Sequence, residues 1–452
     1  MYPPWKSFDL RQELTTRGIQ KFAADYEGTQ RKTVDSVSDE NRVMEKRIMQ
    51  KLKYIILGGG MVAGYAAKEL ASRGLKSGEL AIISADTALP YERPPLSKGF
   101  LSGKDDETNI LINGADWYRE RGIEVRLNTV IERIDPNKRL LLSNSGEEFE
   151  CQHLLLATGA RARKLDVPGN DLRNVFYLRS LKDSETIRSK SASAKEAVIM
   201  GGGFIGMEVA AVLAQKNIQT TMVIREDRVW SRVFTPLMSA FFERYYISRG
   251  VRIVKEAQVA SFEGRGAVQA VLLGDGKKIS CDVVVVGVGA VPVMEPVEKT
   301  GVTVENGIVV NEYLEASRAG LYAAGDVANY PDTIFRKRRR VEHWDNAVSQ
   351  GQHWARVVLG ERQPFVHVPY FFSDVFDLSY EFWGDSSVVD EVVERGDLSS
   401  PSFSVWWLRQ GKLAAAFTMN RPDEEREAAP RLIRARESGF RQHATGGALI
   451  AP

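Results

Sequence analysis

The first half of the chain alternates short apolar runs with glycine turns and amphipathic stretches. The apolar run at 54–57 leads straight into Gly58-Gly59-Gly60, and residues 63–73 then carry small and apolar side chains at helical spacing. A further apolar run follows at 80–84. Continuous apolar runs of this kind are typical of parallel strands that are buried on both faces. The pattern predicts a strand, a tight turn, a helix and a second parallel strand.

The same order of elements returns later in the chain. An apolar run at 197–200 enters Gly201-x-Gly203-x-x-Gly206, a helical stretch continues to Gln215, and another apolar run follows at 219–224. One glycine motif is weak evidence for a nucleotide site, but two copies reinforce each other. Two such units predict two Rossmann-type dinucleotide-binding domains in one α/β chain, and hence electron transfer between two nucleotides.

Apolar strands far along the chain complete the first unit. The run 282–292 leads back to it, and 320–328 adds a strand that ends in Gly325-Asp326. Residues 369–420 are rich in aromatic side chains, with a predicted hairpin turn at Gln410-Gly411, and a charged helix is predicted from Asp423. We expect an N-terminal extension at 1–50, for which disorder is one alternative, a discontinuous first domain at 51–166 and 293–360, a second domain at 167–292, a C-terminal α+β domain at 361–438, and a tail at 439–452.

The composition of the chain limits the possible class of protein, its partners and its compartment. A chain of 452 residues is too long for one core, and no apolar run approaches the roughly 20 residues that span a bilayer, so we expect no membrane span. The net charge of +2 does not indicate a nucleic-acid partner, and we expect none. The only cysteines, Cys151 and Cys281, form no C-x-x-C motif, which suits a reducing compartment, and we expect a cytoplasmic protein. The five histidines show no repeated ligand spacing, so we expect no metal site.

The turn glycines and the strand ends are candidates for binding nucleotides. Without side chains at Gly58 and Gly60, a pyrophosphate can approach the backbone and the helix N-terminus. A carboxylate near the end of the second strand can accept from an adenosine ribose hydroxyl, and Asp86 takes that place. In the second unit Glu226 takes it, which favours NADH. The flanking Arg225, Arg228 and Arg232 keep NADPH open, and a solvated basic face is an equally good interpretation.

Two other segments carry candidate chemistry. The proline-rich loop 88–101 follows the second strand at the sheet edge where ligands bind, so Arg93 and Lys98 are candidate cofactor contacts. Asp326 can bind a chain of hydroxyl groups or cap a helix. The basic run 335–341 can dock an acidic redox protein or form a solvated loop, and both interpretations stay open.

Taken together, the motifs over about residues 52–430 resemble the FAD-dependent pyridine nucleotide-disulfide oxidoreductase superfamily. GGGMVAGYAA, PYERPPLSK, TMVIRE, FTPLMSAFFERYY and VVVVGVGA are most similar to monodehydroascorbate reductases. VEHWDNAVSQG and YFFSD are more similar to ferredoxin reductases and apoptosis-inducing factor. The resemblance implies a glutathione-reductase-like fold of two Rossmann-type domains and a C-terminal α+β domain. It implies FAD in the first domain and NADH, with NADPH as an alternative, in the second.

The resemblance also implies residue roles. For FAD it implies Gly58, Gly60, Gly64, Asp86, Arg93, Lys98, Ala157, Thr158, Gly159, Arg163, Gly325, Asp326, Glu342, His343 and Trp344. For NAD(P)H it implies Gly201, Gly203, Gly206, Glu226 and Gly289. Lys98 and Glu208 are the implied catalytic pair. A cation near the flavin N5 edge stabilises the charge of reduced flavin, and the glutamate fixes the ammonium group.

The implied activity passes electrons from NAD(P)H through FAD to a one-electron acceptor, because the chain offers no redox disulfide. A ferredoxin-type iron–sulfur protein is the first choice, and monodehydroascorbate or a quinone-like small acceptor is the alternative. A redox-sensing flavoprotein with little turnover, as in apoptosis-inducing factor, is a third possibility. Monodehydroascorbate reductases carry an arginine where this chain has Val348 and a tyrosine where it has Phe372, which favours the first choice. The chain is expected to be a monomer or a homodimer.

Overall fold

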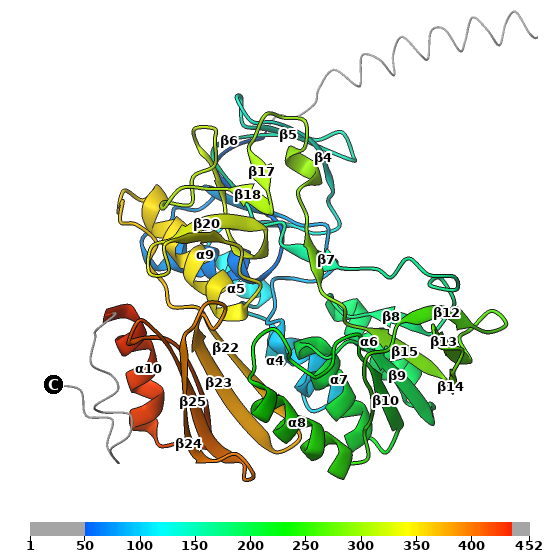
Figure 1. Ribbon diagram of the computed structural model, residues 1–452. Coiled ribbons are helices and arrows are strands. Elements are labelled where there is room, and N and C mark those ends of the chain that lie inside the picture. The colour runs from blue at the N-terminus through cyan, green and yellow to red at the C-terminus, as the bar shows by residue number, and fades with distance from the viewer. Residues whose placement is uncertain (1–49, 436–452) are drawn as a thin grey trace, which may run out of the picture.

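The computed structural model describes residues 50–435, so the expected extension before residue 50 and the tail at 439–452 lie outside the described range. Figure 1 shows three bodies: the first sheet with its long helix at the top, and the second parallel sheet and the C-terminal sheet side by side below it. Within residues 50–435, no helix has the length and apolar character needed to cross a membrane.

The first body is built on a seven-stranded sheet of order β3-β2-β1-β6-β5-β4, with β19 paired to β6. Its strands are β1 (Gln50–Leu57), β2 (Leu80–Ile83), β3 (Glu124–Arg126), β4 (Ile131–Asp135), β5 (Leu140–Ser143), β6 (Glu148–Leu156) and β19 (Leu321–Ala323). β1, β2, β3, β6 and β19 run parallel, and β4 and β5 form an antiparallel addition. Because β19 comes from far along the chain, this sheet is discontinuous in sequence. The boundaries near 166 and 293 stay predictions.

Helices and smaller elements surround this sheet. They are α2 (Met61–Ser72), η1 (Pro94–Ser97), α3 (Gly99–Ser102), α4 (Glu107–Ile110), α5 (Ala115–Glu120), η2 (Glu295–Val297), η3 (Gly325–Val327) and α9 (Trp344–Val358). A four-stranded sheet lies beside it, with β17 (Val304–Glu305), β18 (Gly307–Val309), β20 (Ala328–Asp332) and β21 (Lys337–Arg339). Helix α9 packs along α2, so the segment after Asp326 closes the body that the first glycine turn opens.

The second body is a wholly parallel sheet of order β11-β10-β9-β15-β8. Its strands are β8 (Val175–Tyr177), β9 (Glu196–Met200), β10 (Gln219–Val223), β11 (Arg252–Val254) and β15 (Val283–Val286). Its helices are α6 (Leu181–Ser191), α7 (Phe204–Gln215) and α8 (Pro236–Ser248). An antiparallel sheet of β12 (Val259–Glu263), β13 (Ala270–Leu273) and β14 (Lys278–Ser280) accompanies it. The chain enters and leaves this body through a strand pair, β7 (Ala160–Ala162) with β16 (Ala290–Pro292).

The C-terminal body is a five-stranded antiparallel sheet of order β22-β23-β26-β25-β24 with one helix. Its elements are β22 (Tyr370–Val375), β23 (Leu378–Gly384), β24 (Glu391–Asp397), β25 (Ser402–Arg409), β26 (Lys412–Met419) and α10 (Asp423–Ala435). The predicted hairpin at Gln410-Gly411 joins β25 to β26, and the predicted helix begins at Asp423, so both predictions are confirmed.

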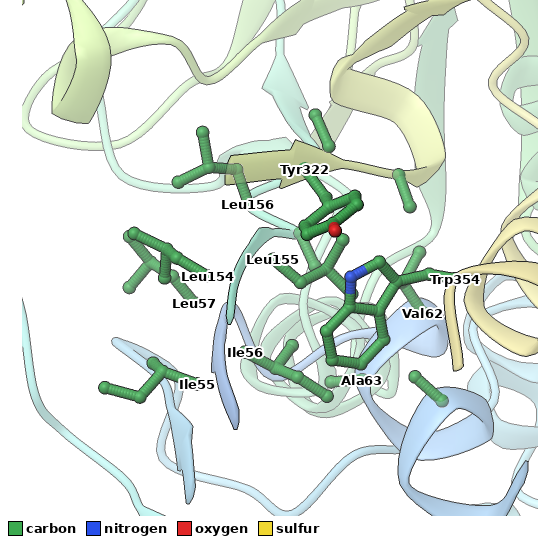
Figure 2. Packing of buried hydrophobic residues seen from close by; sticks show 14 of the residues in the cluster. Ile55, Ile56, Leu57, Val62, Ala63, Leu154, Leu155, Leu156, Tyr322 and Trp354 are labelled. Atoms are coloured by element: carbon green, nitrogen blue, oxygen red, sulfur yellow. The ribbon is translucent and has the colours of Figure 1, made fainter. Parts of the chain in front are cut away.

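The core of the first body explains why its apolar runs become strands. The side chains of Ile56 and Leu155 point toward Trp354 of α9 and toward Val62 and Ala63 of α2 (Figure 2). Ile55 and Leu154 point to the opposite face of the sheet, and they are also fully buried. Trp354 also makes an edge contact with Tyr322 of β19, with ring centroids 6.3 Å apart. Both faces of the strands are thus covered, as their unbroken apolar sequence requires. The close-packed helix α9 brings its first turn to the carboxyl ends of the strands.

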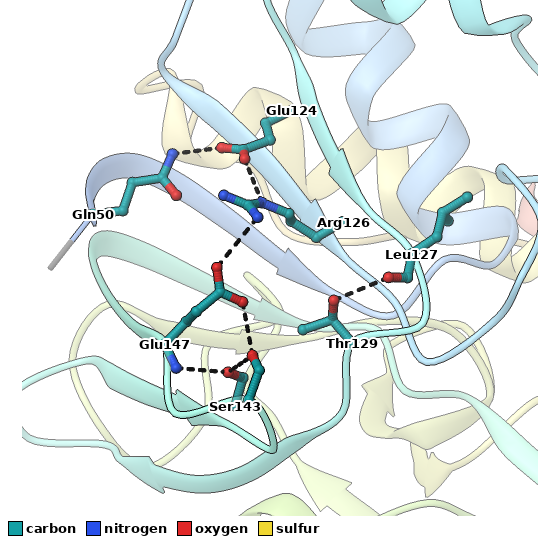
Figure 3. A network of polar contacts seen from close by, with 8 residues as sticks. Gln50, Glu124, Arg126, Leu127, Thr129, Ser143 and Glu147 are labelled. Atoms are coloured by element: carbon teal, nitrogen blue, oxygen red, sulfur yellow. Dashed lines mark hydrogen bonds and ion pairs between the residues drawn. The ribbon is translucent and has the colours of Figure 1, made fainter. Parts of the chain in front are cut away.

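A polar network fixes the outer edge of the same sheet (Figure 3). Gln50 and Arg126 both donate to Glu124, and Arg126 also donates to Glu147 at 3.3 Å. These groups are partly exposed, so each pair adds about 0–1 kcal/mol of stability. The network instead sets the path of the chain after β3. There the amide of Thr129 donates to the carbonyl of Ser84 at 2.8 Å and brings residues 129–131 to a cavity wall.

Candidate active site

A cavity of about 640 Å³ opens where the three bodies meet. The first glycine turn, the loop before α3, η3 and the start of α9 supply one side. The start of α7, residues 287–290 and strand β22 supply the other. Of the residues implied by resemblance, those lining the cavity are Gly58, Gly60, Asp86, Arg93, Lys98, Ala157, Thr158, Gly159, Gly203, Glu208, Gly289, Gly325, Asp326, Glu342, His343 and Trp344.

Five implied residues do not line this cavity. Gly64 lies inside α2 under Ile112, and a Cβ there would meet that side chain at 2.7 Å. Gly201 and Gly206 face each other at the second turn, where a Cβ on Gly206 would meet the Gly201 carbonyl oxygen at 2.1 Å. Gly201 and Gly206 therefore allow α7 to pack closely on the end of β9, and Gly64 allows α2 to pack closely on the loop that carries Ile112. Arg163 is exposed and donates its amide to the Gly289 carbonyl at 2.9 Å, and Glu226 is half-buried at the end of β10.

The first glycine turn has the shape of a phosphate cradle. Gly58 has φ +122°, and a Cβ there would meet the carbonyl oxygen of Ala157 at 2.1 Å, so only glycine fits. In the described chain, α2 starts without a side-chain cap or an acidic residue in its first turn. Its N–H groups therefore face the cavity with the positive end of the helix dipole. The turn suits a nucleotide pyrophosphate, as the sequence predicts.

Arg93 and Arg179 add two cations beside this turn. Arg93 donates to the backbone carbonyl of Arg179, and Arg179 forms an ion pair with Asp326 through Nη2 and Oδ2 at 2.7 Å. The Nε of Arg179 is buried and has no hydrogen-bond partner within the described residues. Burial, and then the charge of Arg179, lowers the pKa of the Arg93 guanidinium from its ordinary value. Two close guanidinium groups with donors to spare fit an anionic cofactor.

Lys98 and Glu208 form the predicted pair, with Nζ and Oε1 3.0 Å apart and both side chains largely buried. The hydroxyls of Ser97 and Ser373 also donate to the Glu208 carboxylate, that of Ser373 at 2.6 Å. The ion pair joins the residue that follows η1 of the first body to α7 of the second. The catalytic role of these two residues stays a prediction.

Asp86 lines the cavity but has local partners. Its Oδ1 accepts the amide of Thr87 at 2.7 Å, and its Oδ2 accepts the hydroxyl of Tyr91 at 3.0 Å. The same Tyr91 hydroxyl accepts the amide of Leu181 at 3.0 Å. Asp86 thus orders the loop that carries Arg93 and Lys98, besides its predicted contact with a ribose.

Aromatic side chains form the wall on the side of the C-terminal sheet. Trp344 donates through Nε1 to Glu92, and its ring meets that of Phe372 edge-on at 6.1 Å. Lys98 lies 5.9 Å from the centre of the Phe372 ring. His343 stacks on Phe371 at 5.0 Å, and burial lowers its pKa to about 4, so the ring is neutral at pH 7. The wall is therefore mainly apolar, with a single ammonium group at its edge.

The basic run at 335–341 is largely engaged within the protein. Arg339 forms ion pairs with Asp332 and Asp385, and Lys337 also pairs with Asp385. Arg338 donates to the carbonyls of Asn329 and Val310, at 2.7 and 2.6 Å. Arg340 pairs with Glu342, the implied cofactor residue. The run contains β21 (Lys337–Arg339) of the four-stranded sheet, so it is not wholly a solvated loop, and its ion pairs hold neighbouring segments together. Arg336, Lys337 and Arg338 are exposed, and the docking interpretation stays a prediction.

Comparisons with known proteins agree with this geometry. A family profile described as "Pyridine nucleotide-disulphide oxidoreductase" matches residues 52–351, and one described as "Reductase C-terminal" matches residues 370–445. The chain belongs to the pyridine nucleotide-disulphide oxidoreductase family. The two matches correspond to the two parallel bodies and to the C-terminal body that Figure 1 shows.

Relatives within the family include plant enzymes. Peroxisomal monodehydroascorbate reductase 1 of Oryza sativa subsp. japonica is 40% identical over 412 residues, which cover 84% of this chain and 86% of that protein. Monodehydroascorbate reductase of Solanum lycopersicum is 36% identical over 411 residues, which cover 85% of this chain and 94% of that protein. This chain is thus an oxidoreductase of the same broad type, which uses FAD and NAD(P)H.

Solved structures with the same fold include ferredoxin reductases. The ferredoxin reductase for the CYP199A2 system of Rhodopseudomonas palustris has a TM-score of 0.84 and 33% identity, covering 87% of this chain and 97% of that one. The reductase in a covalent putidaredoxin reductase–putidaredoxin complex has a TM-score of 0.82 and 32% identity. The match covers 85% of this chain and 93% of that one. The predicted α/β fold, with two Rossmann-type domains and a C-terminal domain, is confirmed.

The cysteines of this family member are placed away from the cavity. Cys151 lies within β6 and Cys281 just before β15, and both are free. Burial raises the pKa of each thiol to about 12, which leaves almost no thiolate at neutral pH. Both thiols are therefore buried and unreactive at neutral pH.

Several site residues were not predicted from the sequence. Arg179 follows β8, and the carboxyl ends of parallel strands meet at one edge, so its position after an apolar strand was a usable signal. Ser97 precedes Lys98 in the same loop. Ser373 and the ring of Phe371 share the inner face of β22, a pattern that predicts burial but gives no hint of the partner.

Proposed function

We propose that the chain passes electrons from NAD(P)H, through FAD, to a ferredoxin-type iron–sulfur protein. The observation that carries this choice of acceptor is the apolar wall formed by Trp344 and Phe372. A small organic anion radical favours a cation and a hydroxyl at its binding place. Here Phe372 offers no hydroxyl, and Val348 is buried in the core of the first body, where it does not line the cavity. The neighbouring hydroxyl of Tyr370 donates to Glu381 at 2.8 Å, and the Lys98 ammonium group pairs with Glu208, so both are already engaged.

FAD, when bound, supplies the conversion of one hydride into two single-electron transfers. The residues of the chain would bind the cofactor and place a charge beside it. The first glycine turn and Arg93 would bind the pyrophosphate, with Arg179 beside them, and Asp326 would contact the ribityl hydroxyls. Lys98, fixed by Glu208, would place a positive charge at the reacting edge of the ring. The remaining implied residues keep their roles as part of this proposal.

The structural neighbours support an iron–sulfur partner, because one of them is a reductase joined to putidaredoxin. A monodehydroascorbate reductase is the second candidate, which the 40% identity to the rice enzyme favours. We also propose a cytoplasmic location, in keeping with the two free cysteines, although the rice relative is a peroxisomal protein. A monomer and a homodimer are equally compatible with the proposal.

A panel of acceptors tests the proposed function. The purified, FAD-loaded chain is assayed with NADH and NADPH against a [2Fe–2S] ferredoxin coupled to cytochrome c, against enzymatically generated monodehydroascorbate, and against a benzoquinone. We expect rapid cytochrome c reduction that depends on added ferredoxin. Faster turnover with monodehydroascorbate would overturn the choice of acceptor in favour of the second candidate. Slow turnover with every acceptor would instead favour a redox-sensing role.

A further inference from the structure

Glu208 is a buried carboxylate, 5% exposed, whose two oxygens are both engaged. Its Oε1 lies 3.0 Å from Nζ of Lys98 and accepts the hydroxyl of Ser373 at 2.6 Å. Its Oε2 accepts the hydroxyl of Ser97. A carboxylate away from water requires such partners, and their directions determine how the group is turned. Residues from all three bodies therefore set the orientation of one carboxylate.

The position of Ser373 follows from how β22 packs on α7. Phe371 of the strand meets Phe204, the first residue of the helix, with ring centroids 4.6 Å apart. Ser373 lies two residues after Phe371 in the strand, and Glu208 lies four residues after Phe204 in the helix. These two residues also meet, through the hydrogen bond from Ser373 to Glu208. Two strand residues and four helix residues each span about 6–7 Å, so both contacts form in one packing register. Ser373 itself is fully buried and does not line the cavity.

We propose that Ser373 is a positioning residue for flavin reduction by NAD(P)H. Its hydroxyl holds Oε1 of Glu208 in place, and the oriented carboxylate directs the Lys98 ammonium group toward the cavity. Without this hydrogen bond, Oε1 has only Lys98 as its partner, and the carboxylate turns and draws the ammonium group away from the cavity. The C-terminal body thus acts on the reductive step as well as forming the aromatic wall. The inference rests on the proposed role of Lys98 and is independent of the acceptor.

The test is Ser373→Ala in the full chain, compared with the unmodified protein. Flavin reduction by NADH is followed anaerobically by stopped flow, without any acceptor. We expect the rate to fall about tenfold, the size expected when one hydrogen bond to a charged group is lost. The visible absorption spectrum of the bound flavin should shift, because the nearby charge moves. Ser373→Thr, which keeps the hydroxyl, should restore both rate and spectrum.

Ser404→Ala is a matched control. Ser404 is also fully buried in the C-terminal sheet, and its hydroxyl donates to a glutamate, Glu425, at 2.8 Å. Its Oγ also accepts Nε1 of Trp406 at 2.9 Å, so this variant should lose at least as much stability as Ser373→Ala. It should nevertheless keep the rate of flavin reduction and the flavin spectrum of the unmodified protein. Equal slowing by both alanine variants would show a structural effect and overturn the proposal.

A second comparison uses the Lys98→Gln background. If Ser373 acts through Lys98, the double variant Lys98→Gln, Ser373→Ala should reduce its flavin as fast as Lys98→Gln alone. The reason is that the alanine substitution can slow the reaction only by displacing the Lys98 ammonium group, which is already absent. Additive slowing, or an unchanged rate and spectrum in the single Ser373→Ala variant, would overturn the proposal. These measurements use no acceptor, so they stay decisive even if the ferredoxin assay fails.

Discussion

Arg179 and Asp326 form an ion pair of 2.7 Å inside the cavity, although they are 147 positions apart in the chain. Arg179 follows the edge strand of the second sheet, and Asp326 lies in η3 after the last strand of the first sheet. The pair therefore links the two nucleotide-binding bodies at the place where the cofactor is proposed to lie. The buried Nε of Arg179, which has no hydrogen-bond partner among residues 50–435, can donate to the cofactor.

Arg179→Gln should weaken FAD binding by about tenfold, because one charged donor beside the pyrophosphate is lost. Fluorescence titration of the apoprotein with FAD measures the affinity. Arg362→Gln is the control, since Arg362 pairs with Glu315 at 2.9 Å on an exposed face. An unchanged FAD affinity in the Arg179 variant would exclude it from the cofactor site.

Lys98→Gln should slow flavin reduction at least about tenfold, because it removes the only ammonium group that lines the cavity within the described residues. Stopped-flow absorbance with saturating NADH measures the rate. Glutamine keeps much of the side-chain length, so packing against Phe372 should survive. The paired variant Glu208→Gln should slow the same step. Unchanged rates in both variants would remove the pair from the proposed mechanism.

Phe372→Tyr should raise kcat/KM with monodehydroascorbate about fivefold, the effect of one added neutral hydrogen bond. Activity with ferredoxin should change little, because the aromatic ring stays in the wall. Initial rates with both acceptors, at fixed NADH, make the comparison. A loss of activity with both acceptors would indicate that the new hydroxyl disturbs the contact with Trp344 rather than binding substrate.

The parts of the fold that local sequence determines were predictable. An unbroken apolar run followed by glycines allows few alternatives to a buried parallel strand and a tight turn, and both copies fold in that way. The hairpin at Gln410-Gly411 is equally local. The Lys98–Glu208 pair joins residues 110 positions apart, and only resemblance to a known family suggested it.

Other parts of the site depend on packing between bodies, which a local pattern of apolar and polar residues does not predict. Ser373 reaches Glu208 only because β22 lies on α7 in one register. The basic run had a clear local signal, yet its charges meet Asp332 and Asp385 from two different sheets. Arg163 matched a family position, yet its exposed side chain does not line the cavity, although its backbone bonds to Gly289, which does. Tertiary contacts determine where each of these side chains lies.

The preference between NADH and NADPH should follow the charges at the end of β10. Arg228 is engaged, since it donates to both oxygens of Asp227, at 3.1 and 3.0 Å, and to the Ser231 carbonyl. Glu226 would accept from ribose hydroxyls and repel a 2′-phosphate. We expect kcat/KM to favour NADH by about tenfold or more. Glu226→Ser should reduce the preference, and equal use of both nucleotides by the unmodified protein would contradict this assignment.

His353 should make the protein sensitive to acid. Burial, and then the charge of Arg356, lowers the pKa of His353 from its usual 6.5 to about 4. Its Nε2 has no hydrogen-bond partner within residues 50–435, and its ring packs edge-on against Phe365 at 5.2 Å. Between pH 6.5 and 4 the unfolded chain therefore binds more protons at this site than the folded chain. The stabilising contribution is complete above pH 6.5 and falls as the pH drops.

At pH 5 this one group should cost about 1 kcal/mol of unfolding free energy, relative to pH 7.5, because water screens the partly exposed ring and reduces the effect of the shift. His353→Gln removes the titrating ring, so the loss of stability between pH 7.5 and 5 should be smaller by that amount. Urea unfolding of both proteins at the two pH values measures the difference. The glutamine variant should be less stable at pH 7.5, because the contact with Phe365 is lost. Parallel stability curves for the two proteins would show that His353 titrates normally and contradict the prediction.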